Sequence, residues 1–163
     1  MTLDDLVEFA GGLDGVVVQT ARAGDGSPEL AWGDTFFYYS PDGTIPAAQP
    51  FATIVTKTYP GEESSRLDRP GAFRVNVAAG RTLFTEYTGV APRDASAPAG
   101  PSPDDTVIAH PTYGSLGWLA VINPGPNTEA DLRRLLRSGW EAARSRFDRR
   151  QAAGSTSQEL SEK

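Results

Sequence analysis

The chain has 163 residues, 39% of them hydrophobic, a length and composition that suit a single domain built around one core. Its net charge of −6 opposes binding to nucleic acid, because that affinity comes largely from Lys and Arg side chains, and its lack of cysteine excludes disulfides and thiolate chemistry. No apolar run approaches the roughly 20 residues that span a bilayer, and the N-terminus is acidic where a signal peptide would be basic, so we expect a cytoplasmic protein that does not enter membranes.

The first forty residues predict one helix and two strands. Thr2 can cap a helix over residues 3–10, where apolar residues recur at helical spacing, and Gly11-Gly12 ends it. The β-branched residues 16–20 and the aromatic-rich residues 32–39 then predict two strands. A short polar loop joins them, so we expect the two strands to pair in antiparallel orientation.

Two more strands and a short helix are predicted in the middle of the chain. Residues 51–58 form the third strand candidate, and residues 73–77 form the fourth, because apolar and polar residues alternate there as on a strand with one buried and one polar face. A short helix around residues 83–87 should end at Gly89. Residues 91–103 are rich in Ala, Pro and Ser and predict a mobile loop.

The last third of the chain holds the only histidine, the most apolar strand and the longest helix. A strand should end near His110, a tight turn should follow at Tyr113-Gly114, and residues 118–122 are apolar on both faces, as in a central strand. From about residue 127 a helix is predicted whose large apolar residues form one stripe that should dock on the sheet. Residues 151–163 predict a disordered polar tail.

Strands that follow one another between terminal helices, without regular βαβ alternation, predict an α+β fold. We expect a single domain over residues 1–150. Its sheet should be mainly antiparallel with about five to six strands, and the N-terminal and the long C-terminal helix should pack on one face of it.

His110 is where acid–base chemistry would first be sought, because histidine changes its charge near neutral pH. It could act as a general base, with Tyr113 or Asp34 completing a proton-transfer pair. The simpler alternative is structural: a histidine before Pro111 at a strand end can use its ring nitrogens to satisfy nearby backbone groups. A single histidine and carboxylates without calcium-loop spacing speak against a metal site, and no motif indicates a cofactor.

Polar and aromatic residues on the predicted strands are the ligand-binding candidates. Arg74 and Asn76 on one strand, with Lys57 on another, could form a floor for an anion or a carbonyl group inside a concave sheet. Alternatively, these side chains lie on the solvated face of an ordinary antiparallel sheet. Tyr38 and Trp118 could line the pocket, although aromatic residues on strands more often divide between core and surface.

The predicted C-terminal helix concentrates positive charge, with seven arginines against four acidic residues between positions 129 and 150. Such a helix could contact nucleic acid or an acidic partner. Arginine stems also cover apolar surface on a solvated helix, which is the simpler interpretation.

Four segments occur in the order found in a known family: residues 32–38, residues 51–55, residues 67–76, and His110-Pro-Thr-Tyr113 followed by residues 117–118 and 121–124. In these segments the chain resembles domain-of-unknown-function family 6194, an uncharacterised bacterial family, over roughly residues 1–150. This resemblance implies that the chain is a member of the family, but it implies no particular activity. The closing order of a Trp-containing strand, an Asn-Pro turn and a helix is also similar to the YjbR-like α+β fold, which implies DNA binding by analogy.

These observations favour a cytoplasmic binding module that holds a small molecule or a protein partner in a sheet concavity near His110, Tyr113, Arg74 and Asn76. One alternative is a proton-transfer enzyme, such as an isomerase, cyclase or hydrolase, with His110 as its base. A second alternative is nucleic-acid binding through the Arg-rich helix, which the acidic net charge opposes. We expect a monomer or a homodimer that needs no cofactor.

Overall fold

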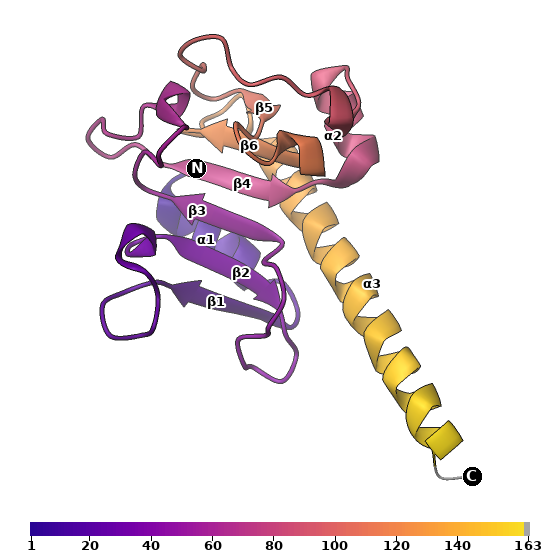
Figure 1. The fold of residues 1–163 in the computed structure, drawn as a ribbon. Coiled ribbons are helices and arrows are strands. Elements are labelled where there is room, and N and C mark those ends of the chain that lie inside the picture. The colour runs from indigo at the N-terminus through magenta and orange to yellow at the C-terminus, as the bar shows by residue number, and fades with distance from the viewer. Residues whose placement is uncertain (162–163) are drawn as a thin grey trace.

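The computed structural model describes the backbone of residues 1–161 and the side chains of residues 1–155. Six antiparallel strands form one sheet in the order β1-β2-β3-β4-β6-β5 (Figure 1). The strands are β1 Val16–Thr20, β2 Thr35–Tyr39, β3 Ala52–Val55, β4 Arg74–Ala78, β5 Val107–Ala109 and β6 Trp118–Ile122. The antiparallel pairing predicted for the first two strands is confirmed, with Val18 of β1 opposite Phe37 of β2.

Helices cover one face of this sheet. They are α1 Leu3–Gly11, α2 Gly80–Thr88 and α3 Glu129–Ser161. α1 and α3 lie behind the sheet in Figure 1, where Leu6 and Leu132 are buried in one core with strand residues such as Ile54 and Val121. α2 packs beside β5 and β6 and contributes the buried Phe84. A sheet backed by an N-terminal and a long C-terminal helix confirms the predicted α+β fold class.

Local chemistry explains where the short helices begin and end. Thr2 Oγ1 accepts a hydrogen bond of 3.1 Å from the backbone nitrogen of Asp5, and Asp5 Oδ2 accepts one of 2.8 Å from the backbone nitrogen of Thr2. This reciprocal capping box satisfies two N–H groups that the first turn leaves free. α2 ends at Gly89, whose φ of 79° is the left-handed conformation that glycine adopts without strain.

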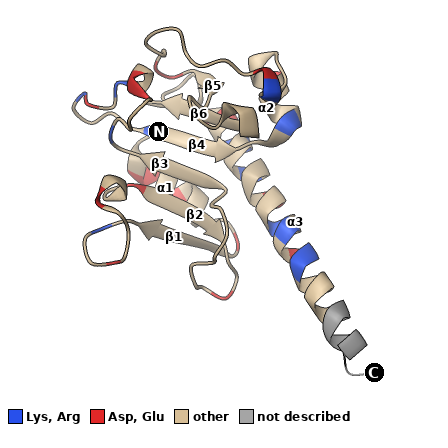
Figure 2. Ribbon diagram, in the orientation of Figure 1, with Lys and Arg blue, Asp and Glu red and all other residues tan. Residues whose placement is uncertain are grey.

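Alternation along the strands places a second set of side chains on the face that α1 and α3 leave uncovered. In the sheet register Thr53 of β3 is opposite Asn76 of β4, and Asn76 is opposite Ala120 of β6. Because successive strand residues point to opposite faces, Arg74 shares this face with Asn76. Charged residues elsewhere lie mainly in loops and helices (Figure 2). The uncovered face therefore combines apolar strands with a few polar groups near its centre.

The segment 91–103 is irregular but attached to the body. It contains the short 3-10 helix η3 Pro92–Asp94, and the backbone nitrogen of Ser102 donates to the Ser64 oxygen at 2.9 Å. Arg66 Nη2 donates to the Ser102 oxygen at 3.2 Å. A loop was predicted here from its composition, and tertiary hydrogen bonds that composition does not reveal connect it to the loop before β4.

α3 continues beyond the body of the protein. Its backbone is helical through Ser161, whereas the sequence predicted a disordered tail over residues 151–163, of which 162–163 lie outside the described residues. The segment 150–161 lacks proline and contains Ala, Gln and Glu, which favour helix continuation. Disorder of this tail in solution stays a prediction. In the described part of the chain, no helix is both long enough and apolar enough to cross a membrane.

Candidate functional site

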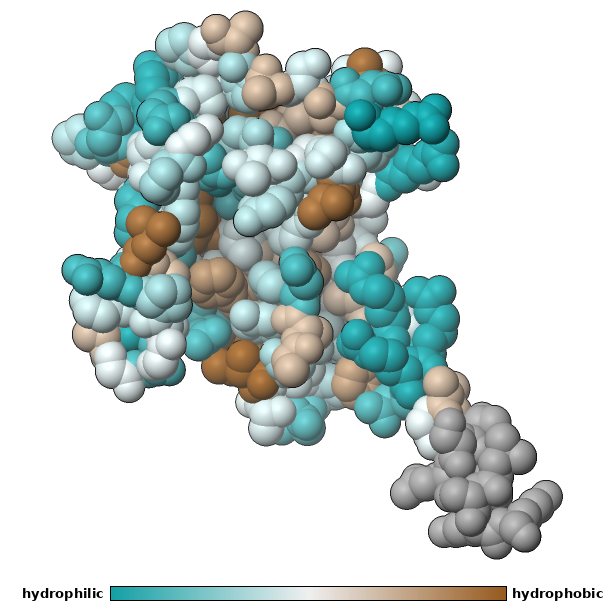
Figure 3. Space-filling view, in the orientation of Figure 1, coloured by the Kyte–Doolittle hydropathy of each residue, from teal (hydrophilic) through white to brown (hydrophobic). Residues whose placement is uncertain are grey.

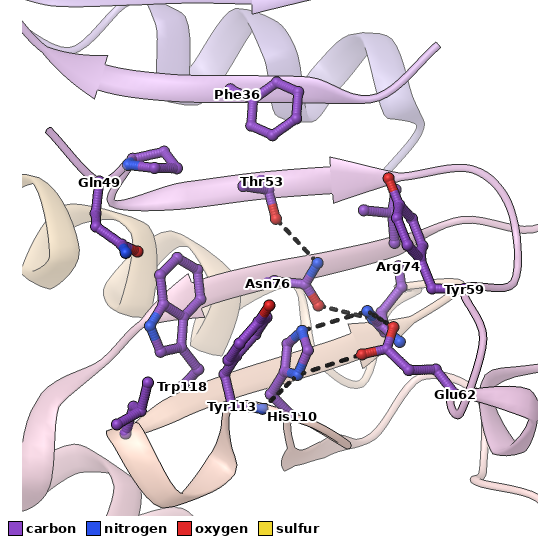
Figure 4. Close-up of a pocket in the computed structure, with 13 residues that line it drawn as sticks. Phe36, Gln49, Thr53, Tyr59, Glu62, Arg74, Asn76, His110, Tyr113 and Trp118 are labelled. Carbon is purple, nitrogen blue, oxygen red and sulfur yellow. Dashed lines mark hydrogen bonds and ion pairs between the residues drawn. The ribbon is translucent and has the colours of Figure 1, made fainter. Parts of the chain in front are cut away.

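A cavity of about 290 Å³ opens on the uncovered face of the sheet. Strands supply its floor through Phe36, Thr53, Arg74 and Asn76, and connecting loops supply the surrounding walls (Figure 4). The space-filling view shows apolar residues on this side of the molecule as separate patches among polar ones (Figure 3). The cavity is thus a local feature of the sheet rather than part of a broad apolar surface.

Arg74 occupies the floor of the cavity with only 2% of its surface exposed. Its Nε donates to Asn76 Oδ1 at 2.7 Å, its Nη1 to Ser65 Oγ at 2.8 Å, and its Nη2 to Glu62 Oε1 at 2.9 Å. A buried guanidinium needs such partners because its charge cannot be removed at any physiological pH. The interpretation of Arg74 and Asn76 as residues of a solvated sheet face is therefore wrong, since the loops before β4 and β6 fold over them.

Glu62 balances the charge of Arg74. Burial raises the pKa of Glu62, but the hydrogen bond from Thr112 and the positive charge of Arg74 outweigh that effect, so its pKa lies below the ordinary value. Thr112 Oγ1 donates to Glu62 Oε2 at 2.5 Å. The carboxylate is therefore ionised at neutral pH and holds the loop after β3 to the loop after β5.

His110 follows β5 and is 6% exposed. Its Nδ1 accepts hydrogen bonds of 3.0 Å from the backbone nitrogens of Thr112 and Tyr113, and its Nε2 lies 3.3 Å from Arg74 Nη2. Burial, followed by the charge of Arg74, lowers the pKa of His110 to about 4, although Glu62 acts in the opposite direction. The ring is therefore neutral at pH 7. One ring nitrogen satisfies backbone groups, as the structural interpretation expected, and the other faces the cavity.

Asn76 extends the polar network across the sheet. Its Nδ2 donates to Thr53 Oγ1 at 3.0 Å while its Oδ1 accepts from Arg74. The hydrogen bonds therefore connect Thr53 through Asn76 and Arg74 to Glu62. Buried polar networks whose members are satisfied are rigid, which fixes the geometry of the cavity floor.

Aromatic and aliphatic residues form the walls. The Tyr113 ring lies with its centroid 4.9 Å from that of His110, and the Trp118 ring meets His110 edge-on at 6.4 Å. Tyr113 is 50% exposed and Leu116 is 72% exposed, so both stand at the mouth. This arrangement leaves apolar surface beside a deep polar floor.

Five of the predicted site residues line the cavity, and three do not. Arg74, Asn76, His110, Tyr113 and Trp118 belong to its lining. The structure thus gathers residues from β4, β6 and the loop between β5 and β6 around one space. Tyr38, Lys57 and Asp34 lie outside that lining.

Asp34 belongs to a separate cluster beside the cavity. It is fully buried, and its carboxylate accepts hydrogen bonds from the Thr56 backbone nitrogen at 3.0 Å and from the Tyr59 hydroxyl. Lys57 Nζ lies 3.5 Å from Asp34 Oδ1 and donates to the Trp32 oxygen at 2.6 Å. Burial, followed by the bond to Asp34, raises the pKa of Tyr59 above its ordinary value. Asp34 is thus engaged by Tyr59 rather than placed beside His110.

Tyr38 lies on β2 opposite Val17 of β1, toward the edge of the sheet. It shares a face with Phe36, because the two are separated by one residue, and Phe36 is the member of this aromatic strand that reaches the cavity. Tyr38 therefore shares a strand and a face with a cavity residue but does not line the cavity itself.

Sequence reasoning missed Glu62, Tyr59 and Thr53, all of which line the cavity. Glu62 lies in a short acidic and serine-rich stretch that has the composition of an exposed turn. No local signal distinguishes it from Glu63, which is exposed. Among the described residues, no group of three or more His, Asp or Glu side chains is placed to hold a metal ion.

The fold and the cavity define an α+β protein whose helix-free sheet face carries a buried Arg–Glu–His network. A family model matches residues 1–152, and the chain belongs to this family of unknown function, DUF6194. The resemblance to this family seen in the sequence is thereby confirmed, whereas the similarity to the YjbR-like fold stays a prediction. No curated protein and no solved structure is similar enough to match the chain.

Proposed function

We propose that this protein is a binding module that holds a small molecule in the cavity on the uncovered sheet face. The main observation that supports this proposal is the burial of the Arg74–Glu62 ion pair at the floor of an open cavity. Well-packed apolar residues would stabilise a fold at least as well as a buried ion pair does. A charged network at this position is therefore better explained by recognition than by stability.

The dimensions and lining of the cavity support a small ligand. Cavities that bind organic ligands usually occupy about 300–1,000 Å³ and are mostly apolar with a few convergent polar groups. The cavity here, about 290 Å³, lies at the small end of this range. Phe36 and Trp118 supply apolar walls, and Arg74, Asn76 and His110 supply the convergent polar groups.

Metabolite capture by the full-length protein tests this proposal. The purified protein is incubated with a cell extract, washed and denatured, and the released molecules are identified by mass spectrometry. Thr53→Phe fills the cavity from its floor, and Leu30→Phe adds the same ring at an exposed position away from it. We expect a specific molecule with the wild type and with Leu30→Phe but not with Thr53→Phe. Equal capture by all three would refute binding in this cavity.

A proton-transfer enzyme that uses His110 is the alternative. The observation in its favour is that Tyr113 lies against the His110 ring at the cavity. Against it, Nδ1 of His110 is engaged by two backbone N–H groups, and Asp34 is engaged by Tyr59 and Thr56. Once a captured molecule is known, its turnover by the wild type and by His110→Ala distinguishes an enzyme from a binding module.

Nucleic-acid binding through α3, which the YjbR-like resemblance also implies, is the second alternative. Figure 2 shows arginines along the outer part of α3, but Arg133 and Arg137 lie over the Phe9 ring, and Arg134 pairs with Glu86. Several arginines therefore contact the protein itself. A DNA titration at increasing salt would show a steep loss of affinity if this alternative were correct.

We place the protein in the cytoplasm, as a monomer or a homodimer, on the sequence alone.

A further inference from the structure

Two nitrogen atoms deep in the cavity lie close together, and the position of the imidazole proton decides whether they form a hydrogen bond. Arg74 Nη2 lies 3.3 Å from His110 Nε2, and the two side chains are 2% and 4% exposed. A guanidinium has only donors. The contact is a hydrogen bond only if Nε2 carries a lone pair and no proton.

The other nitrogen of His110 decides this question. Nδ1 is 3.0 Å from the backbone nitrogens of Thr112 and Tyr113, and a backbone N–H can only donate. Nδ1 therefore carries the lone pair. A neutral imidazole has one proton, which must then reside on Nε2. Arg74 and His110 consequently direct two N–H groups toward the same region, and neither can accept from the other.

Two N–H groups that point toward the same region can both donate a hydrogen bond to one oxygen atom. Of the described residues, only Arg74 makes a polar contact with His110 Nε2, so this N–H has no protein acceptor. A buried donor without an acceptor is destabilising, whereas one acceptor within reach of both nitrogens satisfies the pair. Because Arg74 and His110 line the cavity, a bound molecule can supply that acceptor.

The charge balance favours an uncharged oxygen. Glu62 Oε1, at 2.9 Å from Arg74 Nη2, already neutralises the guanidinium. A ligand carboxylate would place a second negative charge on the same guanidinium in a buried site, where an uncompensated charge is strongly unfavourable. A carbonyl oxygen accepts two hydrogen bonds and adds no charge.

We propose that the ligand presents an uncharged carbonyl-type oxygen, as in an amide, a lactam or a ketone, to Arg74 Nη2 and His110 Nε2. Its apolar part is a flat ring, because Tyr113 and Trp118 supply aromatic surface next to His110 and Phe36 supplies it on the far side of the cavity (Figure 4). This inference rests on the proposed binding function and names the chemical class of its ligand.

Nitrogen NMR of the histidine ring tests the donor pair without any ligand. The chain has one histidine, so its two ring nitrogens can be assigned without ambiguity. At pH 7 we expect the proton on Nε2 and none on Nδ1. A proton on Nδ1 would overturn the inference, whatever the cavity binds.

Titration with three matched probes tests the ligand class. Benzamide has a neutral carbonyl oxygen, benzoate a carboxylate, and toluene no oxygen, and all three have the same ring. We expect benzamide to bind at least about tenfold more tightly than either of the others, as one net hydrogen bond in a buried site predicts. Tighter binding of benzoate, or equal binding of toluene, would overturn the inference and leave the binding proposal intact.

Two substitutions test whether the N–H of His110 Nε2 itself contributes to benzamide binding. His110→Asn keeps an oxygen that can accept from the backbone nitrogens of Thr112 and Tyr113 but loses the N–H at the Nε2 position. Leu30→Phe changes an exposed side chain that does not line the cavity. We expect benzamide affinity to fall about tenfold in His110→Asn and to stay within about twofold in Leu30→Phe. An unchanged affinity in a folded His110→Asn protein would overturn the inference. If none of the probes binds the wild type, the inference fails, and metabolite capture by the wild type and by Thr53→Phe decides the binding proposal separately.

Discussion

Arg74 Nη2 and Glu62 Oε1 lie 2.9 Å apart, and their side chains are only 2% and 7% exposed. This ion pair joins the central strand β4 to the loop after β3, and Thr112 connects it to the loop after β5. Its burial makes it sensitive to the loss of either charge. The cavity floor and part of the fold therefore depend on the same contact.

Glu62→Gln should destabilise the protein by about 3–5 kcal/mol, because it leaves the buried Arg74 charge without a counterion. Urea unfolding at pH 7 measures this loss. The matched control is Glu86→Gln, which breaks the exposed ion pair with Arg134. It should change the free energy of unfolding little, since solvent screens exposed pairs. Equal effects of the two substitutions would show that the Glu62 charge is not buried in the folded protein.

The stability of the protein should fall as the pH decreases from 6.5 to 4. The pKa of His110 is lowered to about 4 in the folded protein, so within this window the unfolded chain binds a proton that the folded chain does not. The stabilisation linked to the neutral His110 ring is fully present at a pH above the pKa of this histidine in the unfolded chain. It is lost progressively as the pH falls toward the pKa of His110 in the folded protein.

The histidine should account for about 3 kcal/mol of stability between these two pH values, because a tenfold change in a proton-binding constant corresponds to about 1.4 kcal/mol. Unfolding curves at several pH values measure it. The lowered pKa of Glu62 acts in the same direction, but chiefly below pH 4.5. His110→Asn should therefore flatten the dependence between pH 5 and 6.5. A slope that persists in this variant would assign the effect to other groups.

Tyr59→Phe should destabilise the protein by about 1–3 kcal/mol, because it removes a hydrogen-bond donor from the fully buried carboxylate of Asp34. Thermal and urea unfolding measure the change. Tyr38→Phe removes the same hydroxyl from a tyrosine on β2, outside this cluster, and should change stability by less than about 0.5 kcal/mol. The prediction is contradicted if both substitutions are neutral.

Gly139→Leu should destabilise the docking of α3 on the sheet. A Cβ atom at this position would meet Val77 Cγ1 at 3.2 Å and the Phe51 oxygen at 3.3 Å, so a larger side chain forces the helix away. Overpacking of this kind costs about 1–3 kcal/mol. A Cβ atom at Gly154 of the same helix would meet no other atom within 4 Å, so Gly154→Leu should not destabilise the protein. Urea unfolding of both variants makes the comparison.

Local periodicity is enough to predict the strands, the helices and the fold class from the amino-acid sequence. The strand predicted over residues 118–122 is β6, the strand over 16–20 is β1, and Thr2 caps α1 as expected. Alternation along β4 also assigned Arg74 and Asn76 to the face opposite the apolar residues. Each of these inferences uses neighbours within a few positions, where hydrogen bonding and side-chain direction follow directly from spacing.

Which polar residues meet, and whether they are buried, depends on contacts between segments that are far apart in the sequence. Glu62 and His110 reach Arg74 from loops 12 and 36 positions away, and neither loop has a local pattern that predicts its path. Asp34 was one of two candidate partners of His110, with Tyr113 as the other, but its carboxylate accepts hydrogen bonds from Tyr59 and Thr56. Long-range contacts of this kind depend on how loops close over the sheet, and their energies come from burial and charge compensation, which residue spacing does not encode.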